Sequence, residues 1–344
     1  QAPAAPVDCC ESGSTLRFLI PLAALTGRPV AFTGRGRLMQ RPQSVYQELF
    51  ASQGLRFEQE GDTLTVAGPL RPGCFSLAGD VSSQFISGLL FALPLLDGDS
   101  RLCPKPPVES RSYIEMTRAA QSRFGVASAW LDEYTLAVPG GQAYRPRDMA
   151  IEGDWSQAAF PAALGVLAGD VTVTGLEPGT LQGDAVILDI LRRCGGRAEA
   201  VPGGVRFQKS ALHGTKIDLA DCPDLGPILM ALGLLCEGET VITNAGRLRL
   251  KESDRIAAME QELRKLGGRI ESDGGTVTVR CSALHAPAGP LWGHNDHRVV
   301  MSLTVLAAAA GLPVQIDGAE AVAKSWPGFF AAVRQLGVEV QTDA

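Results

Sequence analysis

The sequence predicts an α/β protein made of two inside-out α/β barrel domains, each built from βαβαββ repeats. Two observations lead to this fold class. An apolar helix followed by a strand recurs five times at nearly constant spacing, and these helices are apolar on almost every side. A helix without a polar face must be buried inside a domain. We therefore expect the helices to lie inside and the strands outside.

The first half of each repeat is a polar turn, a capping residue, a helix rich in leucine and small residues, and a Val/Ile/Thr strand. Loose alternation of helices and strands is common in α/β proteins, but matched copies at one spacing indicate a true repeat. The equivalent helix starts lie 68, 74, 68 and 72 residues apart, at Ser14, Ser82, Ser156, Asp224 and Asp296.

The second half of each repeat is an amphipathic helix that ends in glycine, followed by a hairpin. Residues 253–279 show it best: Gly267 ends the helix, and Asp273-Gly274-Gly275 turns the hairpin. One face of this helix carries Ile256, Met259, Leu263 and Leu266. Similar units begin at Arg41, Arg111, Asp184 and Pro327. Each repeat therefore reads as βαβαββ.

Length and repeat positions predict two domains. A chain of 344 residues is long enough for two cores. We place the first domain at residues 1–150, with two repeats, and the second at 151–344, with three.

Composition excludes several classes of protein. Hydrophobic residues make up 45% of the chain, yet no apolar run reaches the length of about 18 residues that a membrane span needs. The net charge of −6 argues against a general binder of nucleic acid or anionic membranes. The eight cysteines are scattered and contain no C-x-x-C, which is typical of a reducing compartment. We expect a cytoplasmic, monomeric protein, although the first residue is Gln1 and upstream targeting is open.

The buried helices aim their N-termini, with unsatisfied N–H groups and the positive dipole end, at a common region, which predicts an anion site. Ser82-Ser83-Gln84 and Gly13-Ser14-Thr15 place hydroxyls there. Cations oppose the dipole at a helix start, so a set of them indicates a bound anion. The alternative for each residue alone is an ordinary cap or a solvated charge. The basic residues at these starts are Arg41, Arg111, Arg247, Arg249, Lys251, Arg255, Arg298 and Lys324.

Two polar runs stand out beside buried helices, residues 249–255 and 295–298. His294, Asp296 and His297 match no zinc spacing, so we expect no metal. Glu252 lies between cations and is a candidate proton donor, with a capping network as the alternative.

A set of motifs covers essentially the whole chain in one order: SGSTLR, Arg41-Pro42, GDVSSQF, SRSYI, CPDLGPILM, RLKESDR, NDHR and AKSWPGFF. In order and spacing the chain resembles the EPSP synthase (3-phosphoshikimate 1-carboxyvinyltransferase) family. The resemblance implies the enolpyruvyl transferase fold of six βαβαββ units, of which five are present here. It implies transfer of the enolpyruvyl group of phosphoenolpyruvate to the 5-hydroxyl of shikimate-3-phosphate, in aromatic amino-acid biosynthesis, without metal or cofactor. It also implies that the two domains close over the substrates.

The resemblance also implies roles for individual residues. Asp224 would accept the hydroxyl proton, Glu252 would exchange the proton at C3, and Lys251 and His297 would assist. Shikimate-3-phosphate would be held by Ser82, Ser83, Gln84, Ser110, Tyr113, Asp224 and Lys251. Phosphoenolpyruvate would be held by Gly13, Arg41, Gln84, Arg255, Arg298 and Lys324.

Three departures and two alternatives accompany this resemblance. The family's first repeat, with a Pro-Gly-Ser-Lys-Ser run, is not found before Gln1, and Glu11 and Arg247 stand where the family commonly has Asn. One alternative is a non-catalytic anion-binding fragment or pseudoenzyme. The other is UDP-N-acetylglucosamine enolpyruvyl transferase, which the lack of a cysteine in a mobile-loop motif disfavours. Gly13 stands where a small residue leaves room for the inhibitor glyphosate.

Overall fold

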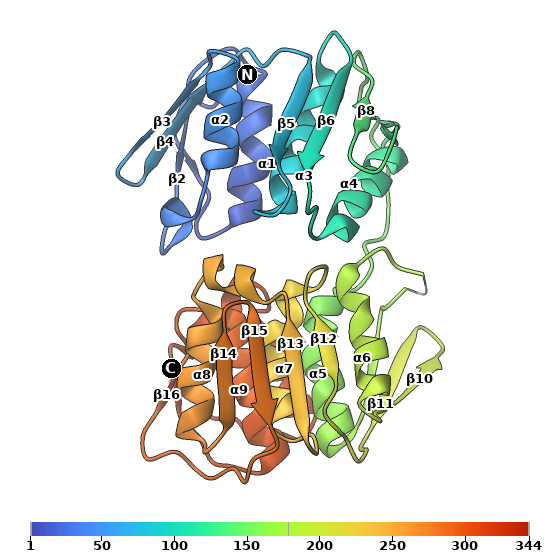
Figure 1. The fold of residues 1–344 in the computed structure, drawn as a ribbon, viewed down its shortest axis with the longest axis vertical. Helices are drawn as coiled ribbons and strands as arrows, with labels where there is room; N and C mark the ends of the chain where they lie inside the picture. Colours follow the sequence, from blue (N-terminus) through green and yellow to red (C-terminus); the bar gives the residue numbers. More distant parts are fainter. Residues whose placement is uncertain (1, 178, 343–344) are drawn as a thin grey trace. The chain divides into compact units, whose positions relative to one another are not determined.

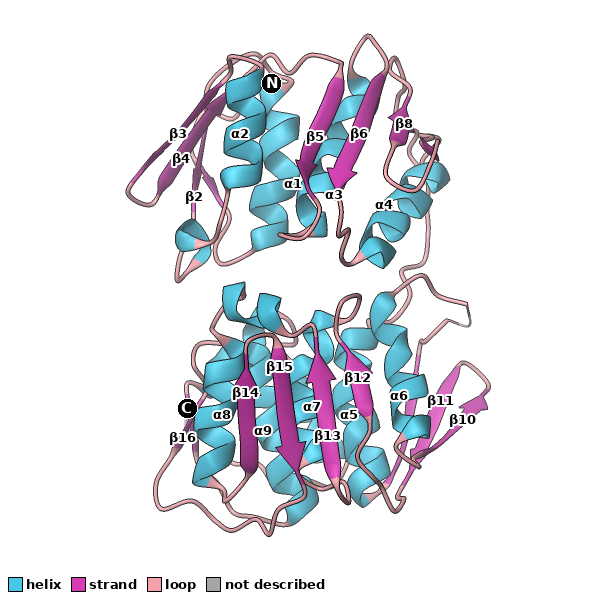
Figure 2. Cartoon of the chain, viewed as in Figure 1, coloured by secondary structure: helices cyan, strands magenta, loops and turns pink. Residues whose placement is uncertain are grey.

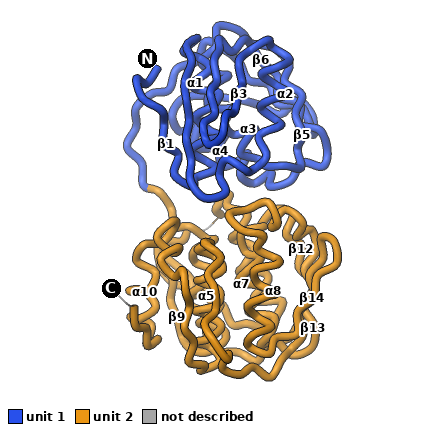
Figure 3. The backbone as a smooth tube through the Cα atoms, turned by 90° about the vertical axis from the view of Figure 1, so that its left-hand side faces the viewer, with its two compact units in different colours: residues 1–150 blue, residues 151–344 orange. Residues whose placement is uncertain are grey.

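The computed structural model describes residues 2–177 and 179–342. The chain forms two compact units, Gln1–Ala150 and Ile151–Ala344 (Figure 3). Each unit has its own hydrophobic core.

The first repeat is a four-stranded sheet packed on two helices. Its strand order is β1-β2-β4-β3, with β1 parallel to β2 and the other neighbours antiparallel. The predicted unit βαβαββ is therefore confirmed here. Its elements are β1 (Val7–Asp8), α1 (Gly13–Ala24), β2 (Val30–Thr33), α2 (Ser44–Ser52), β3 (Arg56–Glu60) and β4 (Thr63–Ala67).

The second and fourth repeats have the same topology. Their sheets run β5-β6-β8-β7 and β12-β13-β15-β14, again with one parallel pair and two antiparallel pairs. The predicted hairpin turn joins β14 to β15 at Gly274, whose φ of 56° lies in the left-handed region. The second repeat comprises β5 (Cys74–Ala78), α3 (Ser83–Ala92), β6 (Ser100–Lys105), α4 (Arg111–Arg123), β7 (Ala129–Trp130) and β8 (Leu136–Val138). The fourth comprises β12 (Lys216–Asp218), α7 (Gly226–Gly233), β13 (Glu239–Thr243), α8 (Arg255–Lys265), β14 (Arg269–Asp273) and β15 (Thr276–Arg280).

The third and fifth repeats are incomplete, which corrects the expectation that every repeat reads βαβαββ. The third has no described first strand. In its place a single backbone hydrogen bond runs from the Gly153 N–H to the Gly175 carbonyl at 2.7 Å. This segment connects the two units. Its elements are α5 (Trp155–Ala168), β9 (Asp170–Thr174), α6 (Ile187–Arg193), β10 (Arg197–Val201) and β11 (Gly204–Gln208). The fifth has no hairpin within the residues described, which end at residue 342. Its elements are β16 (Leu291–Trp292), α9 (His297–Ala310), β17 (Ile316–Asp317) and α10 (Phe329–Gln335).

The apolar helices lie inside and the sheets outside, as predicted (Figures 1 and 2). In the second unit, α5, α7 and α9 pack against one another. All residues of α7 are buried, and α9 is buried from His297 to Ala307. The amphipathic helix α8 turns its predicted apolar face inward, with Ile256 and Met259 fully buried. None of the described helices is both long and apolar enough to cross a membrane.

Polar residues begin the buried helices, close to the predicted starts. The Ser12 hydroxyl accepts from the Thr15 N–H at 3.1 Å, and Ser82 caps α3. Asp154 accepts from the Ser156 N–H at 2.8 Å, and Asp296 accepts from the Arg298 N–H at 2.9 Å. Such caps satisfy N–H groups that the helix itself leaves unpaired. Helix α7 differs, because a short 3₁₀ turn, Pro223–Leu225, precedes it.

Candidate active site

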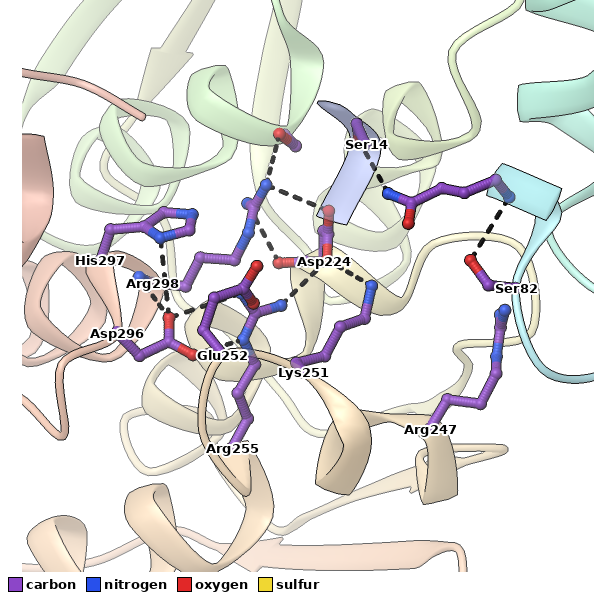
Figure 4. Close-up of polar contacts among 12 residues, drawn as sticks. Ser14, Ser82, Asp224, Arg247, Lys251, Glu252, Arg255, Asp296, His297 and Arg298 are labelled. Atoms are coloured by element: carbon purple, nitrogen blue, oxygen red, sulfur yellow. Dashed lines mark hydrogen bonds and ion pairs between the residues drawn. The ribbon is translucent and has the colours of Figure 1, made fainter. Parts of the chain in front are cut away.

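The guanidinium of Arg255 is the centre of a charged cluster in the second unit (Figure 4). Its side chain is 1% exposed, and each of its three nitrogens donates to a carboxylate. Nε donates to Asp296 Oδ2 at 2.8 Å, Nη1 to Asp224 Oδ1 at 2.9 Å and Nη2 to Glu252 Oε2 at 2.8 Å. A buried guanidinium needs such partners because removing a charge from water is costly. Arg255 therefore fixes three carboxylates in one place.

Asp224 lies among three cations. Its carboxylate accepts from Lys251 Nζ at 3.2 Å, from Arg255, and from Arg298 Nη2 at 3.2 Å. Burial alone would raise the pKa of this carboxyl, but the combined attraction of the three cations outweighs burial and holds the pKa well below its usual range. Asp224 is therefore ionised in the substrate-free molecule.

Local structure explains how these residues meet. Asp224 lies in the 3₁₀ turn before α7, Arg255 is the first residue of α8, and Asp296 is the N-cap of α9. Lys251 follows the 3₁₀ helix Gly246–Leu250. Three helix N-termini thus bring together residues up to 74 positions apart, as in the Arg298–Asp224 contact.

Part of the negative charge that balances the cations at these helix starts comes from carboxylates of the protein itself. Lys251, Arg255 and Arg298 carry three positive charges, and Asp224, Glu252 and Asp296 carry three negative charges, so this set is neutral. An incoming anion must therefore compete with carboxylates for the cations. Pre-arranged cations of this kind stabilise negative charge that develops in a transition state.

His297 is the first residue of α9 and lies beside this set. Burial lowers the pKa of its imidazole to about 4, with the positive charges of Arg298 and Arg255 adding to the effect and Asp296 and Glu252 opposing it. At neutral pH His297 is therefore uncharged. A neutral imidazole can donate a hydrogen bond but adds no positive charge to the cluster.

This shift predicts a pH dependence of stability. The folded-state pKa lies below the unfolded value of 6.5, so the unfolded chain binds the proton more tightly. The stabilisation is complete above pH 6.5 and is lost as the pH falls towards 4. We expect a loss on the order of 3 kcal/mol over this range. Urea unfolding of the substrate-free protein at several pH values measures it.

The matched controls are two histidine variants. His297→Asn should remove this part of the pH dependence, whereas His213→Asn, at an exposed position, should keep it. An unchanged slope in His297→Asn would show that other groups carry the effect.

The remaining predicted site residue of the second unit, Lys324, lies against the loop that precedes α9. Lys324 Nζ donates to the Asn295 carbonyl at 2.6 Å. Both His294 and Asn295 have positive φ, 51° and 52°, so this loop has a specific shape that leads directly to Asp296.

The residue that anchors this loop, Glu262 of α8, is not among the predicted site residues. Its fully buried carboxylate accepts from Lys265 Nζ at 2.7 Å, the Trp292 N–H at 2.9 Å and His294 Nε2 at 3.0 Å. The sequence carries no signal for this role, because a glutamate in an amphipathic helix is ordinarily solvated. Ser156 was noted only as a helix start, yet its hydroxyl accepts from Arg298 Nη2 at 3.0 Å.

The first unit gathers a second polar set around Gln84. Its amide nitrogen donates to Ser14 Oγ at 2.8 Å, and its amide oxygen accepts from Arg17 Nη1 at 2.8 Å. Arg17 also donates to the Pro42 carbonyl at 3.0 Å and stacks over the Phe85 ring at 4.6 Å. Arg17 is not among the predicted site residues, although a single arginine within an apolar helix is a usable signal in the sequence.

Gly13 and Arg41, both predicted to hold one ligand, lie together. A Cβ atom built on Gly13 would lie 2.7 Å from Arg41 Nη1. No real Cβ tolerates such a contact, so only glycine lets the guanidinium approach this helix start.

Ser82, Ser83, Ser110 and Tyr113 begin two neighbouring helices of the first unit. Ser82 caps α3, Ser83 follows it and is buried, and Ser110 precedes α4 with a φ of 55°. The Ser87 and Thr117 hydroxyls join α3 to α4 at 2.7 Å. This hydrogen bond holds the two helices side by side.

Three of the predicted basic residues have contacts within their own unit. Arg111 stacks over Trp130 at 4.3 Å, Arg247 donates to the Ala220 carbonyl at 2.6 Å, and Arg249 pairs with Asp254 at 3.1 Å. Among the described residues, no group of three or more His, Cys, Asp or Glu side chains is arranged to hold a metal.

Comparisons with known proteins point in one direction. A family model described as EPSP synthase (3-phosphoshikimate 1-carboxyvinyltransferase) matches residues 1–333. The 3-phosphoshikimate 1-carboxyvinyltransferase of Clostridium kluyveri is 41% identical over 336 residues, which are 97% of this chain and 79% of the relative. The protein of the same name from Clostridium acetobutylicum is 41% identical over 338 residues, 97% of this chain and 78% of the relative.

Solved structures confirm the predicted fold class. EPSP synthase from Acinetobacter baumannii matches with a TM-score of 0.77 at 21% identity, covering 99% of this chain and 81% of that one. The enolpyruvyl transferase NikO from Streptomyces tendae matches with a TM-score of 0.71 at 16% identity, covering 99% of this chain and 96% of that one.

Proposed function

This chain belongs to the EPSP synthase (3-phosphoshikimate 1-carboxyvinyltransferase) family, and from that premise we propose that it transfers the enolpyruvyl group of phosphoenolpyruvate to the 5-hydroxyl of shikimate-3-phosphate. The products are EPSP and phosphate. The observation that carries the proposal is the cluster around Arg255, which holds Asp224 and Glu252 beside three cations. This arrangement supplies a proton acceptor, a proton donor and positive charge for a leaving phosphate.

We propose that the reaction proceeds by addition and elimination. The 5-hydroxyl oxygen attacks C2 of phosphoenolpyruvate while C3 gains a proton, which gives a tetrahedral intermediate. The C2–O bond to phosphate then breaks, and C3 loses a proton. Asp224 would accept the hydroxyl proton. Glu252, ionised beside Arg255 in the substrate-free molecule, would take up a proton as the anionic substrates bind, deliver it to C3, and later remove a proton from C3.

The electrostatics of Asp224 support its role as the acceptor. Its pKa is low because Arg298, Lys251 and Arg255 attract the carboxylate. Substrate anions that draw these cations towards themselves would weaken that attraction and raise the basicity of Asp224. Binding would therefore activate the base only when substrate is present.

The remaining site residues divide into two sets by the unit they belong to. In the first unit, the hydroxyl and amide groups of Ser82, Ser83, Gln84, Ser110 and Tyr113 would bind shikimate-3-phosphate, and Gly13 and Arg41 would bind phosphoenolpyruvate. In the second unit, Arg298 and Lys324 would bind phosphoenolpyruvate directly. The neutral imidazole of His297 and the ammonium of Lys251 would donate hydrogen bonds as phosphate departs. Arg255 donates from all three nitrogens to carboxylates, so we propose that it mainly positions Asp224 and Glu252.

The direct test is phosphate release. With both substrates the chain should release phosphate, and with UDP-N-acetylglucosamine in place of shikimate-3-phosphate it should not. If shikimate-3-phosphate raises the melting temperature but no phosphate forms, the chain binds its ligand without turnover. The absence of the family's first repeat stays a prediction, and this assay shows whether the residues of this chain suffice.

Gly13→Ala tests the proposed binding of phosphoenolpyruvate. The new methyl group would displace the Arg41 guanidinium, whose nearest atom lies 2.7 Å from the built Cβ. A weakened charge-assisted hydrogen bond predicts a rise of about tenfold or more in the KM for phosphoenolpyruvate, with little change in the KM for shikimate-3-phosphate. Gly73→Ala is the control, because nothing lies within 4 Å of its Cβ position. Equal effects on both KM values would contradict the assignment of Arg41.

We also propose that the protein acts in the cytoplasm as a monomer. All eight cysteines are free thiols, which suits a reducing compartment. Sedimentation of the purified chain at several concentrations tests the oligomeric state.

A further inference from the structure

Two cysteines lie side by side on neighbouring strands of the first unit. The Cys74 and Cys103 sulfurs are 3.5 Å apart. In the parallel pair β5 and β6, Cys74 lies opposite Arg101 and Cys103 opposite Ser76, so the two cysteines are diagonal neighbours. Alternate residues of a strand point to the same face. Cys74, exposed, and Cys103, half-buried, therefore share the outer face of the sheet.

Burial separates this pair from most of the other cysteines. Burial raises the pKa of Cys9 to about 11 and that of Cys222 to about 12, so neither forms a thiolate near neutral pH. Cys194 and Cys236 also interact, but each is only 1% exposed, so a dissolved oxidant cannot reach them. Cys10 is exposed, but its sequence neighbour Cys9 is buried.

The two thiols differ in a way that assigns them different roles. Burial and a hydrogen bond to Cys74 raise the pKa of Cys103, which therefore keeps its proton. Cys74 is exposed, and either sulfur can donate the hydrogen bond between them. Cys74 is therefore the residue that an oxidant meets first, and Cys103 is the residue placed to resolve the product.

We propose that Cys74 and Cys103 form a reversible dithiol–disulfide site, oxidised by a hydroperoxide such as H₂O₂. The Cys74 thiolate attacks one peroxide oxygen, the O–O bond breaks, and the released hydroxide takes a proton to become water. Cys74 is then a sulfenic acid. The Cys103 sulfur attacks the Cys74 sulfur, the S–O bond breaks, and a second water leaves with the Cys103 proton. Two thiols have lost two electrons, and one peroxide has become two waters.

The two sulfurs must come closer before a bond can form. A disulfide has an S–S bond of about 2.0 Å, so the sulfurs must approach by roughly 1.5 Å. Because the Cα atoms of diagonal neighbours lie about 7–8 Å apart, farther than in most disulfides, closing the bond also requires a local shift of the β5 or β6 backbone. These strands lead into Ser82 and Ser110, so the disulfide would cross-link the scaffold of the first-unit site.

The test is peptide mapping of the whole chain after treatment with H₂O₂. Proline follows both Arg71 and Lys105, so trypsin leaves Cys74 in peptide 57–101 and Cys103 in peptide 102–111. We expect these two peptides to be joined by a bond that a thiol reductant cleaves, in a chain that stays monomeric on a non-reducing gel.

Serine variants supply the controls. Cys103→Ser should prevent the link and leave Cys74 as a sulfenic acid that dimedone traps, whereas Cys10→Ser should leave the link unchanged. Thermal unfolding of the reduced variants checks that they are folded. If the peptides stay separate while Cys74 is oxidised further or joins another chain, the proposal is wrong.

Discussion

Replacing Glu252 by Gln is expected to lower kcat by about 10²- to 10⁴-fold, the usual contribution of a positioned acid or base. The amide keeps an oxygen that can accept from Arg255 Nη2, which lies 2.8 Å from the present carboxylate. The cluster should therefore keep its geometry while losing the group that moves the C3 proton. Steady-state phosphate release measures kcat, and the melting shift with shikimate-3-phosphate measures binding.

Glu260→Gln is the matched control, because Glu260 lies in α8, the helix that follows Glu252, and pairs only with Arg264, at 3.6 Å, in the ion pairs of the described residues. This control should keep the wild-type kcat. A Glu252→Gln enzyme that loses activity only because it no longer binds substrate would assign Glu252 to binding and not to proton transfer.

Arg255→Met should cause the largest loss of stability. It leaves Asp296, which is fully buried, without its guanidinium partner, and removes the contact that Arg255 makes with Asp224. Removing one partner of a buried ion pair costs about 3–5 kcal/mol, because the remaining charge stays buried. Urea unfolding of the full chain, monitored with a spectroscopic probe in the second unit, measures the loss in the free energy of unfolding.

Arg206→Met is the control for Arg255→Met. Arg206 pairs with Asp170 at the surface, where its side chain is 43% exposed, and exposed pairs contribute about 1 kcal/mol or less. Arg255→Lys keeps the charge but not the three-way geometry and should fall between the two. A stability of Arg255→Met equal to that of the control would mean that the carboxylates do not depend on Arg255.

The fold was predictable because its strongest signal is local. Helices such as α7 are apolar on every side, and only burial inside a domain accommodates such a helix. The spacing of these helices then indicated the repeat. The incomplete third repeat was not predictable, because whether residues before Trp155 form a full strand depends on their role as the connection between two units.

The sequence predicted the cations at the helix starts, but it did not predict that carboxylates of the protein neutralise them. Arg255 and Arg298 attracted attention because cations oppose the dipole at a helix start. That Asp224, Glu252 and Asp296 neutralise them follows only from contacts between residues as far apart as 224 and 298. The role of Glu262 could not be predicted for the same reason, since its partners Trp292 and His294 lie about thirty residues later in the sequence.

The exchange of the proton at C3 tests the proposed addition–elimination mechanism most directly. With turnover in D₂O, the proposed addition and elimination require C3 to become a methyl group that loses one of three hydrogens. The vinyl methylene of the product should therefore contain deuterium, detected by mass spectrometry and NMR, and Glu252→Gln should incorporate it at least a hundredfold more slowly. A wild-type product formed without deuterium, or equally fast incorporation in Glu252→Gln, would contradict the mechanism and the role of Glu252.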